Sequence, residues 1–308
     1  MLVVDRARGS FQDLRFADLP SLLGSGDCLL LNDTKVLPAR LFGHRRGHTG
    51  HVEVFLVKPL ADDPMCWLTL VRPGRKIRTG DSIEFAPGLE ALVVGRNDHG
   101  ERMVRFQCDG DLHEALDRHG HVPLPPYIRR PDADADRDRY QTVFARQRGS
   151  VAAPTAGLHF TQAILEGCRA AGADIAHLTL HVGLGTFQPL TTDCVEDVRL
   201  HGERYEVSGG AALAVSRASR VVCVGTTAVR TIESTRGAAG SGETSLFISP
   251  GHRFEVTGAM LTNFHLPKSS LLMLVCAFAG TELTLAAYRH AAASGYRFYS
   301  YGDCMLVV

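Results

Sequence analysis

No two cysteines in this chain have the C-x-x-C spacing that marks zinc and iron–sulfur sites. The chain has 8 cysteines, and several stand inside apolar runs, as Cys223 does between Val222 and Val224. Free thiols in such surroundings behave as small apolar side chains. We therefore predict reduced, buried cysteines and no metal site.

A membrane-spanning stretch and a secretory signal are also missing. The longest apolar run, 271–279, is far too short to cross a bilayer. The N-terminus has neither the basic start nor the small-residue cleavage site of a signal peptide. These absences predict a cytoplasmic protein with no membrane association.

Net charge is missing as well, because 33 Lys and Arg residues balance 33 Asp and Glu residues. No global positive field attracts nucleic acid, so RNA binding would need a local patch. One basic cluster comprises Arg72, Arg75, Lys76 and Arg78. It is either a phosphate contact or a solvated hairpin tip. Only four lysines occur, and codon bias explains the arginine excess better than function does.

The length of 308 residues fits two domains. The pattern of apolar and polar residues also changes along the chain. An apolar run, 28–31, reads as a buried strand that ends in a polar loop. After residue 41, short β-rich runs separated by Gly and Pro turns predict a small barrel or sandwich. The runs are 51–57, 66–71, 82–85, 91–94 and 102–107. A helix over 111–118 and a Pro-rich, exposed connector over 122–139 should follow.

From about residue 140, helical and strand-like patterns alternate. Helices are predicted over 161–171, 211–218 and 226–234, and strands over 174–182 and 220–224. This alternation predicts an α/β domain with a mixed, largely parallel sheet and an inserted small β-barrel. The α/β domain comprises 1–40 and 141–308, and the inserted domain with its connector comprises 41–140. The Gly/Ser stretch 237–242 reads as a mobile surface loop.

Several predicted strands end in Gly, Thr and charged residues, which is where open α/β sheets bind ligands. In 221–230, Thr226 and Thr227 stand where a helix should begin, so they either help to bind an anion or simply cap the helix. In 180–187, the Gly-x-Gly-Thr pattern lets backbone approach a ligand closely, although it lacks the third glycine of a dinucleotide fingerprint.

Four of the 14 histidines lie in Gly-, Thr- or Pro-rich segments: His159, His181, His201 and His265. Any single histidine is more often structural than catalytic, but histidine moves protons near neutral pH. If 201–205 is extended, His201, Glu203 and Tyr205 share one face of the strand.

Eight blocks of this chain, in order, resemble the S-adenosylmethionine:tRNA ribosyltransferase-isomerases. They include LLNDTKVLPAR at 30–40, VAAPTAGLHF at 151–160 and TLHVGLGTFQP at 179–189. The others are 120–128, 201–205, 224–230, 262–267 and 296–303.

The resemblance implies an α/β domain with an inserted β-barrel, and a reaction that residue spacing does not reveal. The ribosyl part of S-adenosylmethionine is transferred to 7-aminomethyl-7-deazaguanine at the tRNA wobble position. Epoxyqueuosine forms, and adenine and methionine are released. The expected partners are that tRNA and S-adenosylmethionine as cosubstrate, with no other cofactor, no metal and no membrane, and the chain is expected to act as a monomer.

The site residues expected from the resembling blocks fall into two groups. His181, His201, Glu203 and His265 are the catalytic candidates, although the motifs do not settle which group is the general base. The substrate-binding candidates are Asn32, Lys35, Thr155, Gly157, His159, Gly183, Gly185, Thr186, Thr226, Thr227, Arg230 and Asn263.

Members of the resembling family usually begin earlier, with a Pro-containing segment before the stretch that matches 2–6. We therefore expect this 308-residue form to be less stable and less active than one extended upstream. Lys268-Ser269-Ser270 and Cys304 are smaller departures from the family pattern.

Two other functions remain open. A methyltransferase would use the same cosubstrate, but 27–60 shows no Gly-rich loop after a first strand. It would release S-adenosylhomocysteine in place of adenine. A non-catalytic RNA-binding protein built on the β domain would leave S-adenosylmethionine intact.

Overall fold

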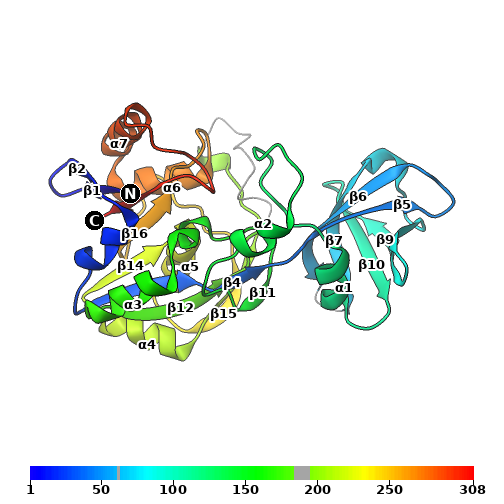
Figure 1. The fold of residues 1–308 in the computed structure, drawn as a ribbon, viewed down its shortest axis with the longest axis horizontal. Helices are drawn as coiled ribbons and strands as arrows, with labels where there is room; N and C mark the ends of the chain where they lie inside the picture. Colours follow the sequence, from blue (N-terminus) through cyan, green and yellow to red (C-terminus); the bar gives the residue numbers. More distant parts are fainter. Residues whose placement is uncertain (61–62, 184–194) are drawn as a thin grey trace. The chain divides into compact units, whose positions relative to one another are not determined.

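The computed structural model describes residues 1–60, 63–183 and 195–308, and the chain divides into two compact units (Figure 1). The sheet unit comprises 1–35, 141–147 and 153–308. The barrel unit comprises 36–140 and 148–152. The sequence pattern had placed the domain boundaries near residues 41 and 140. A mixed α/β sheet with a closed β-barrel is present, so the predicted fold class is confirmed.

The sheet unit is built on a nine-stranded sheet of order β15-β13-β12-β3-β14-β16-β17-β1-β2. Its parallel centre consists of β12 (Asp174–Leu180), β3 (Asp27–Asn32), β14 (Arg220–Val224) and β16 (Thr257–Asn263). Antiparallel strands extend it on one side through β13 (Glu203–Val207) and β15 (Gly240–Thr244). On the other side lie β17 (Cys304–Val307), β1 (Leu2–Asp5) and β2 (Ser10–Asp13).

The central strand β3 is buried along its whole length, as its apolar run predicted. A strand covered on both faces carries apolar side chains at every position, because neither face meets water. Between Asp27 at its start and Asn32 at its end, every residue of the strand is apolar. Polar side chains therefore lie at the edge of the sheet where its parallel strands end.

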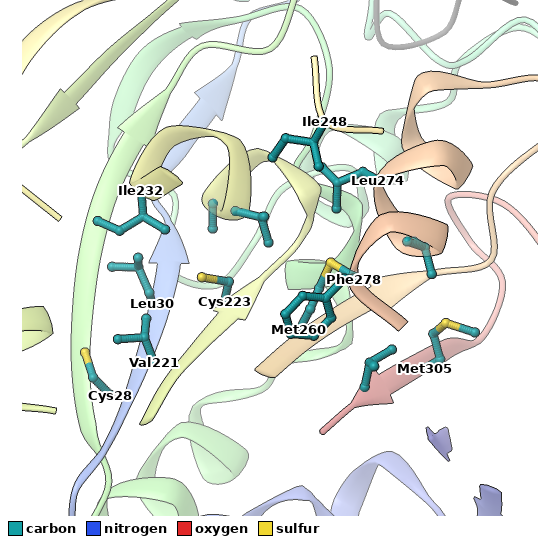
Figure 2. Packing of buried hydrophobic residues seen from close by; sticks show 14 of the residues in the cluster. Cys28, Leu30, Val221, Cys223, Ile232, Ile248, Met260, Leu274, Phe278 and Met305 are labelled. Carbon is teal, nitrogen blue, oxygen red and sulfur yellow. The ribbon is translucent and has the colours of Figure 1, made fainter. Parts of the chain in front are cut away.

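Helices cover both faces of this sheet. One face packs against side chains of α4 (Gly209–Arg217), α5 (Thr226–Thr235), α6 (Ser270–Ala279) and α7 (Thr281–Ala293). Figure 2 shows Leu30, Cys223 and Met260 from the strands beside Ile232 and Phe278 from the helices. The other face packs against α3 (Gln162–Ala170), η1 (Phe16–Leu22) and η3 (Thr155–His159).

The prediction of buried cysteines is confirmed for five of the seven cysteines that the structure describes. Cys28, Cys168, Cys223, Cys276 and Cys304 are buried free thiols, and Cys66 and Cys108 are half-buried. Burial raises the pKa of Cys28 to about 11, because the charged thiolate loses its hydration. In 1–60, 63–183 and 195–308 no single helix is long and apolar enough to cross a membrane. The helices α6 and α7 are long and apolar enough only when taken together, and they are bent by 113° relative to each other.

The barrel unit is a closed six-stranded barrel of order β10-β7-β6-β5-β8-β9. Its strands are β5 (Arg40–Arg45), β6 (His51–Leu60), β7 (Asp63–Arg72), β8 (Ser82–Ala86), β9 (Leu89–Arg96) and β10 (Arg102–Cys108). Between β7 and β8 lies the short η2 (Gly74–Lys76). The helix α1 (Leu112–His119) follows β10, and the side chain of Asp111 caps it by accepting a bond from Glu114 N.

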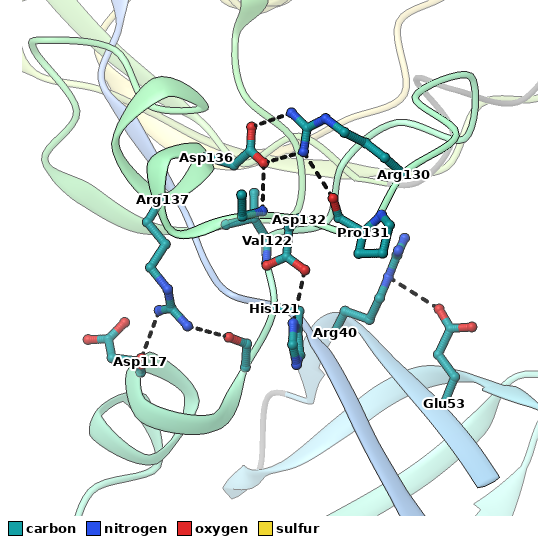
Figure 3. Close-up of polar contacts among 12 residues, drawn as sticks. Arg40, Glu53, Asp117, His121, Val122, Arg130, Pro131, Asp132, Asp136 and Arg137 are labelled. Carbon is teal, nitrogen blue, oxygen red and sulfur yellow. Dashed lines mark hydrogen bonds and ion pairs between the residues drawn. The ribbon is translucent and has the colours of Figure 1, made fainter.

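The connector after α1 is only in part the exposed loop that the sequence predicted (Figure 3). It contains α2 (Asp134–Arg139), and the carboxylate of Asp136 in it is 3% exposed. Asp136 accepts two bonds from the Arg130 guanidinium, at 2.6 and 2.8 Å, and one from Ala133 N. Asp132 similarly accepts bonds from His121 Nδ1 and Val122 N. These paired carboxylates order a segment whose composition alone suggests a loop.

A short two-stranded sheet links β4 (Thr34–Val36) with β11 (Gln147–Ser150). The Gly/Ser stretch predicted as a mobile loop is also ordered in part, because Gly240 begins the exposed edge strand β15. That strand pairs with β13 from Gly240 to Thr244. The partner strand supplies the hydrogen bonds, so a weak local strand propensity is sufficient.

Candidate functional site

The polar strand exits meet at the carboxyl ends of the parallel strands, as predicted for an open α/β sheet. Asn32 ends β3, His181 follows β12, Gly225 follows β14 and Asn263 ends β16. Because these four strands run in the same direction, their exits lie along one edge of the sheet unit.

Asn32 makes four hydrogen bonds at this edge and is 1% exposed. Its Nδ2 donates to Leu180 O at 3.0 Å and to Thr227 Oγ1 at 3.2 Å. Its Oδ1 accepts bonds from the backbone N–H groups of Thr34 and Leu180. A buried amide that satisfies both of its ends fixes its neighbours in place. Asn32 therefore positions the ends of β12 and α5, and its side chain has little capacity left for a ligand.

His181 lies beside Thr34, whose hydroxyl is 2.9 Å from the imidazole Nδ1. The same hydroxyl is 3.5 Å from the carbonyl of Gln147, which can only accept. If the hydroxyl donates to that carbonyl, His181 donates from Nδ1 and its Nε2 keeps a lone pair. Burial, followed by the nearby charge of Arg204, lowers the pKa of His181 to about 4. The imidazole is therefore neutral at pH 7 and able to accept a proton.

A buried ion pair joins Glu203 at the start of β13 to Arg230 in α5. Glu203 is 5% exposed and Arg230 is 6% exposed. Arg230 Nη1 donates to Glu203 Oε2 at 2.5 Å, and the backbone N–H of Gly183 donates to Glu203 Oε1 at 2.8 Å. Arg230 Nε also donates to Leu246 O. The pair connects the segment after β12 with β13 and α5.

A small cavity of about 20 Å³ opens beside this ion pair. It is lined by Gly183, Leu200, His201, Glu203, Arg230, Ser270 and Leu271. Arg230 Nη2 is buried without a hydrogen-bond partner. An unpaired buried donor is costly unless a ligand or water accepts from it. The cavity is large enough for one water-sized group, so the geometry offers this donor to an oxygen atom there.

The predicted alternation along 201–205 is present only for Glu203 and Tyr205, which lie on the same face of β13. His201 precedes the strand and is exposed, yet it lines the cavity with Glu203. The structure thus brings together seven predicted residues: Asn32, His181, Gly183, His201, Glu203, Thr227 and Arg230.

His159 and Asn263 form a second group at the end of β16. Asn263 Nδ2 donates to Tyr299 O at 3.2 Å and lies 3.3 Å from His159 Nε2, which therefore accepts. Asn263 Oδ1 is buried without a partner. The ring of His159 also rests on Phe16. Burial is the main cause that lowers the pKa of His159 to about 4. In the part of the chain that the structure describes, no hydrogen bond links this pair to Asn32 or Arg230.

His265 is held by other contacts. Its Nε2 is 2.7 Å from Thr262 Oγ1, and its backbone N–H donates to the hydroxyl of Tyr288. Burial lowers the pKa of His265 to about 4. One ring nitrogen is thus already engaged, which favours a positioning role over proton transfer.

The alternative that a threonine caps α5 is wrong. Gly225 occupies the cap position with φ of 87°, a conformation that favours glycine, and no side chain caps the first turn. Thr227 instead accepts the bond from Asn32, and Thr226 is buried beside it. Both threonines are therefore buried at this edge of the sheet.

The remaining predicted positions differ in their surroundings. Thr155 begins η3 and Lys35 lies half-buried in β4. Gly157 is a packing position, because a Cβ there would lie 2.8 Å from both Phe144 and Thr142. Gly185 and Thr186 lie outside the described residues.

Sequence reasoning missed Thr34 and Asp33, although both belong to the polar run that follows β3. Thr34 contacts His181, and Asp33 Oδ1 accepts a bond from Thr179 Oγ1 at 2.7 Å. The polar run itself was the available signal. It also missed Ser270 and Leu271, which line the cavity from the first turn of α6 and carry no chemical signature in the sequence.

The buried histidines predict a loss of stability in weak acid. Burial lowers the folded-state pKa of His159, His181 and His265 to about 4, whereas unfolded histidine titrates near 6.5. Between these values the unfolded chain binds more protons, so stability is present above pH 6.5 and is lost as the pH falls towards 4. Unfolding should take up as many as about three protons at pH 5 and almost none at pH 7.5, and urea unfolding across this pH range measures the difference.

A matched pair of variants tests whether the buried histidines cause this loss of stability in weak acid. His265→Gln should flatten the pH dependence by about one proton, whereas His119→Gln, at an exposed position, should leave it unchanged. An unchanged slope in both variants would mean that other groups cause the acid sensitivity.

The comparisons with known proteins identify the class. A family model described as queuosine biosynthesis protein matches residues 1–307. The chain therefore belongs to this family of queuosine biosynthesis proteins.

Individual relatives carry a more specific name. The S-adenosylmethionine:tRNA ribosyltransferase-isomerase of Solibacter usitatus is 58% identical, over 100% of this chain and 92% of its own length. That of Geobacter metallireducens is 49% identical with the same coverage. The crystal structure of S-adenosylmethionine tRNA ribosyltransferase from Thermotoga maritima is 32% identical, with a TM-score of 0.52 over 100% of this chain and 91% of that chain.

Proposed function

We propose that this chain transfers the ribosyl part of S-adenosylmethionine to 7-aminomethyl-7-deazaguanine at the tRNA wobble position and isomerises it to epoxyqueuosine. Membership of the queuosine family over 1–307 is the observation that carries this function. The relatives named as S-adenosylmethionine:tRNA ribosyltransferase-isomerases support the same reaction. The chain is accordingly a transferase and isomerase that modifies tRNA.

The reaction needs a base, an acid and a shell that orients the cosubstrate. The sulfonium of S-adenosylmethionine acidifies the adjacent C5′ hydrogens, so a base can remove one of them. Adenine leaves with its bonding electrons and a proton, the aminomethyl group adds to the sugar, and closure of the epoxide expels methionine. The two released molecules therefore report two separate bond cleavages.

His181 is the residue that we assign as the general base. Its pKa, lowered to about 4 by burial, keeps the imidazole neutral at pH 7. Its Nδ1 is engaged by the Thr34 hydroxyl, which leaves Nε2 for the substrate proton. The pH at which the base becomes protonated should then lie well below the usual range of histidine.

The Glu203–Arg230 pair is assigned to orientation. Arg230 Nη2, buried and without a partner, would donate to an oxygen atom of the bound cosubstrate. Glu203 holds the guanidinium in place and compensates its charge. Asn32 supports both by fixing the ends of β12 and α5. His159, His201, His265 and Asn263 are assigned to contacts around the same sheet edge.

Release of free adenine is the test of the function. Incubation with S-adenosylmethionine and tRNA that carries the aminomethyl-deazaguanine should yield adenine and methionine in equal amounts. Unmodified tRNA of the same sequence is the matched control and should yield neither. Formation of S-adenosylhomocysteine would show a methyltransferase, and an unchanged cosubstrate would show that the chain only binds RNA.

Activity is expected to be independent of metal and of any cofactor besides S-adenosylmethionine. The reaction requires proton transfers and orientation only, and the sequence has no spaced cysteine pair for a metal. Turnover in EDTA should therefore stay within about twofold of the untreated enzyme. Loss of turnover that one added metal specifically restores would contradict this expectation.

We place this activity in the cytoplasm, where tRNA is modified. We propose that the chain acts as a monomer. The sheet unit would act as the catalytic domain and the barrel unit as an insertion in it.

A further inference from the structure

The connection between β7 and β8 crosses one end of the barrel and is not a hairpin. In the order β10-β7-β6-β5-β8-β9, two strands separate β7 from β8 on either side. The sequence alternative of a solvated hairpin tip is therefore wrong. Ile77, in the middle of this connection, is buried at the end of the barrel. We call residues 72–78 the basic loop.

A buried guanidinium holds the basic loop in shape. Arg102, at the start of β10, is 5% exposed. It donates from Nε to Ile77 O at 3.2 Å and from Nη2 to Gly74 O at 2.5 Å. Its Nη1 donates to Gly100 O at 2.5 Å. Three carbonyls thus satisfy a charged group that would otherwise be costly to bury, and two of them belong to the basic loop.

Arg102 adds positive charge without a compensating acid. Burial, with the nearby charge of Arg96, lowers the pKa of Arg102 but leaves the guanidinium charged. Within the residues that the structure describes, no ion pair joins a carboxylate to Arg102 or to the side chains of the basic loop. Two acids beside the loop are engaged elsewhere: Asp81 accepts from Arg78 N and pairs with Arg45, and Glu53, which lies opposite Arg72, pairs with Arg40.

The exposed surface of the basic loop therefore consists mainly of basic side chains on a backbone that Arg102 holds in place. Arg72, Arg75, Lys76 and Arg78 are all exposed, as is the neighbouring Arg96. The large apolar side chain in the loop, Ile77, is 2% exposed and is therefore not available to a membrane surface. Exposed arginines on a rigid backbone are suited to phosphate oxygens, since the guanidinium binds them through two parallel bonds.

We propose that the basic loop is a contact for the RNA phosphate backbone, and that Arg102 is the positioning residue that shapes it. This inference rests on the proposed function, which makes tRNA the substrate. The whole protein has no net charge to attract RNA, so the binding free energy from phosphates must come from a local surface such as this one. The basic loop provides such a surface with four exposed cations and a fifth beneath them.

Charge reversal of the loop is the first test. The triple variant Arg75→Glu, Lys76→Glu and Arg78→Glu should raise the Kd for substrate tRNA at least about tenfold at 150 mM salt. The slope of log affinity against log salt should decrease by about two to three, because three phosphate contacts are lost. The matched control reverses three exposed arginines of the sheet unit, Arg217, Arg253 and Arg289, and should change both quantities far less.

Two outcomes would overturn the proposal. One is an unchanged salt slope in the loop variant while the wild type binds tRNA and releases adenine. The other is an equal loss in the control variant, which would indicate non-specific attraction. Absence of adenine release from the wild type would instead contradict the proposed function, so the two failures are distinguishable.

Arg102→Lys tests the positioning role separately. Lysine keeps the charge but cannot donate to the three carbonyls in the same geometry. The KM for tRNA should rise about three- to tenfold with kcat unchanged at saturating tRNA, and the affinity for S-adenosylmethionine should stay constant. A reduced kcat at unchanged KM would overturn this role. If the variant does not fold, the exposed triple variant still decides whether the loop binds RNA.

Discussion

Arg230→Met is expected to lower the free energy of unfolding by about 3–5 kcal/mol, because it leaves the buried Glu203 carboxylate without its partner. Arg230 and Glu203 are both buried, so water cannot replace the lost charge. In the sheet unit this corresponds to a decrease in Tm on the order of 10 °C. Urea and thermal unfolding of the two proteins measure it directly.

The double variant Glu203→Gln with Arg230→Met is the matched control. Removing both charges avoids an unpaired buried ion, so most of the lost stability should return. Activity should stay low in both variants, since each lacks the Nη2 donor that faces the cavity. The loss of one charge-assisted hydrogen bond predicts about a 10- to 100-fold weaker affinity for S-adenosylmethionine. A single variant as stable as the wild type would show that the ion pair is not buried in solution.

His181→Gln is expected to reduce turnover about 10²- to 10⁴-fold, because the amide cannot take up the substrate proton. Affinity for S-adenosylmethionine should change only a few-fold, since orientation depends on Asn32 and Arg230. The wild-type rate should be flat from about pH 7.5 to 5.5 and fall only as the pH approaches 4. The reason is that the base loses function when it is protonated, and its pKa is about 4.

His265→Gln separates this role from a general effect of removing a histidine. His265 Nε2 is already engaged by Thr262, so its replacement should cost less than about tenfold in turnover. Single-turnover kinetics at saturating tRNA measure both variants. If His181→Gln retains turnover within a few-fold, or if the rate falls near pH 6.5 in the wild type, another group is the base.

The sequence predicted those parts of the fold that depend on local pattern. The apolar run of β3, the helical spacing of α3 and the short strands of the barrel are all present. It failed where one particular side-chain partner or a pairing strand supplies the stabilising contact. The helix α2 depends on the carboxylate of Asp136 and its partner Arg130, and β15 depends on pairing with β13.

The candidate site was predictable to the same extent. The strand exits indicated Asn32, His181 and Thr227, because Gly, Thr and polar residues follow apolar strands there. The pairing of Glu203 with Arg230, 27 residues apart, follows from the fold and has no sequence signal of its own. Thr34 was overlooked because a threonine after a strand has many structural explanations.

The position of β17 has a consequence for the order of folding. The strands β1 and β2 join the nine-stranded sheet only through β17, which lies between β16 and β1. Val4 pairs with Val307, about 300 residues away along the chain. Contacts between such distant segments form slowly, because the intervening chain must first be brought together. The β1–β2 hairpin is therefore the part of the sheet that assembles last, after β16 has provided an edge on which β17 can pair.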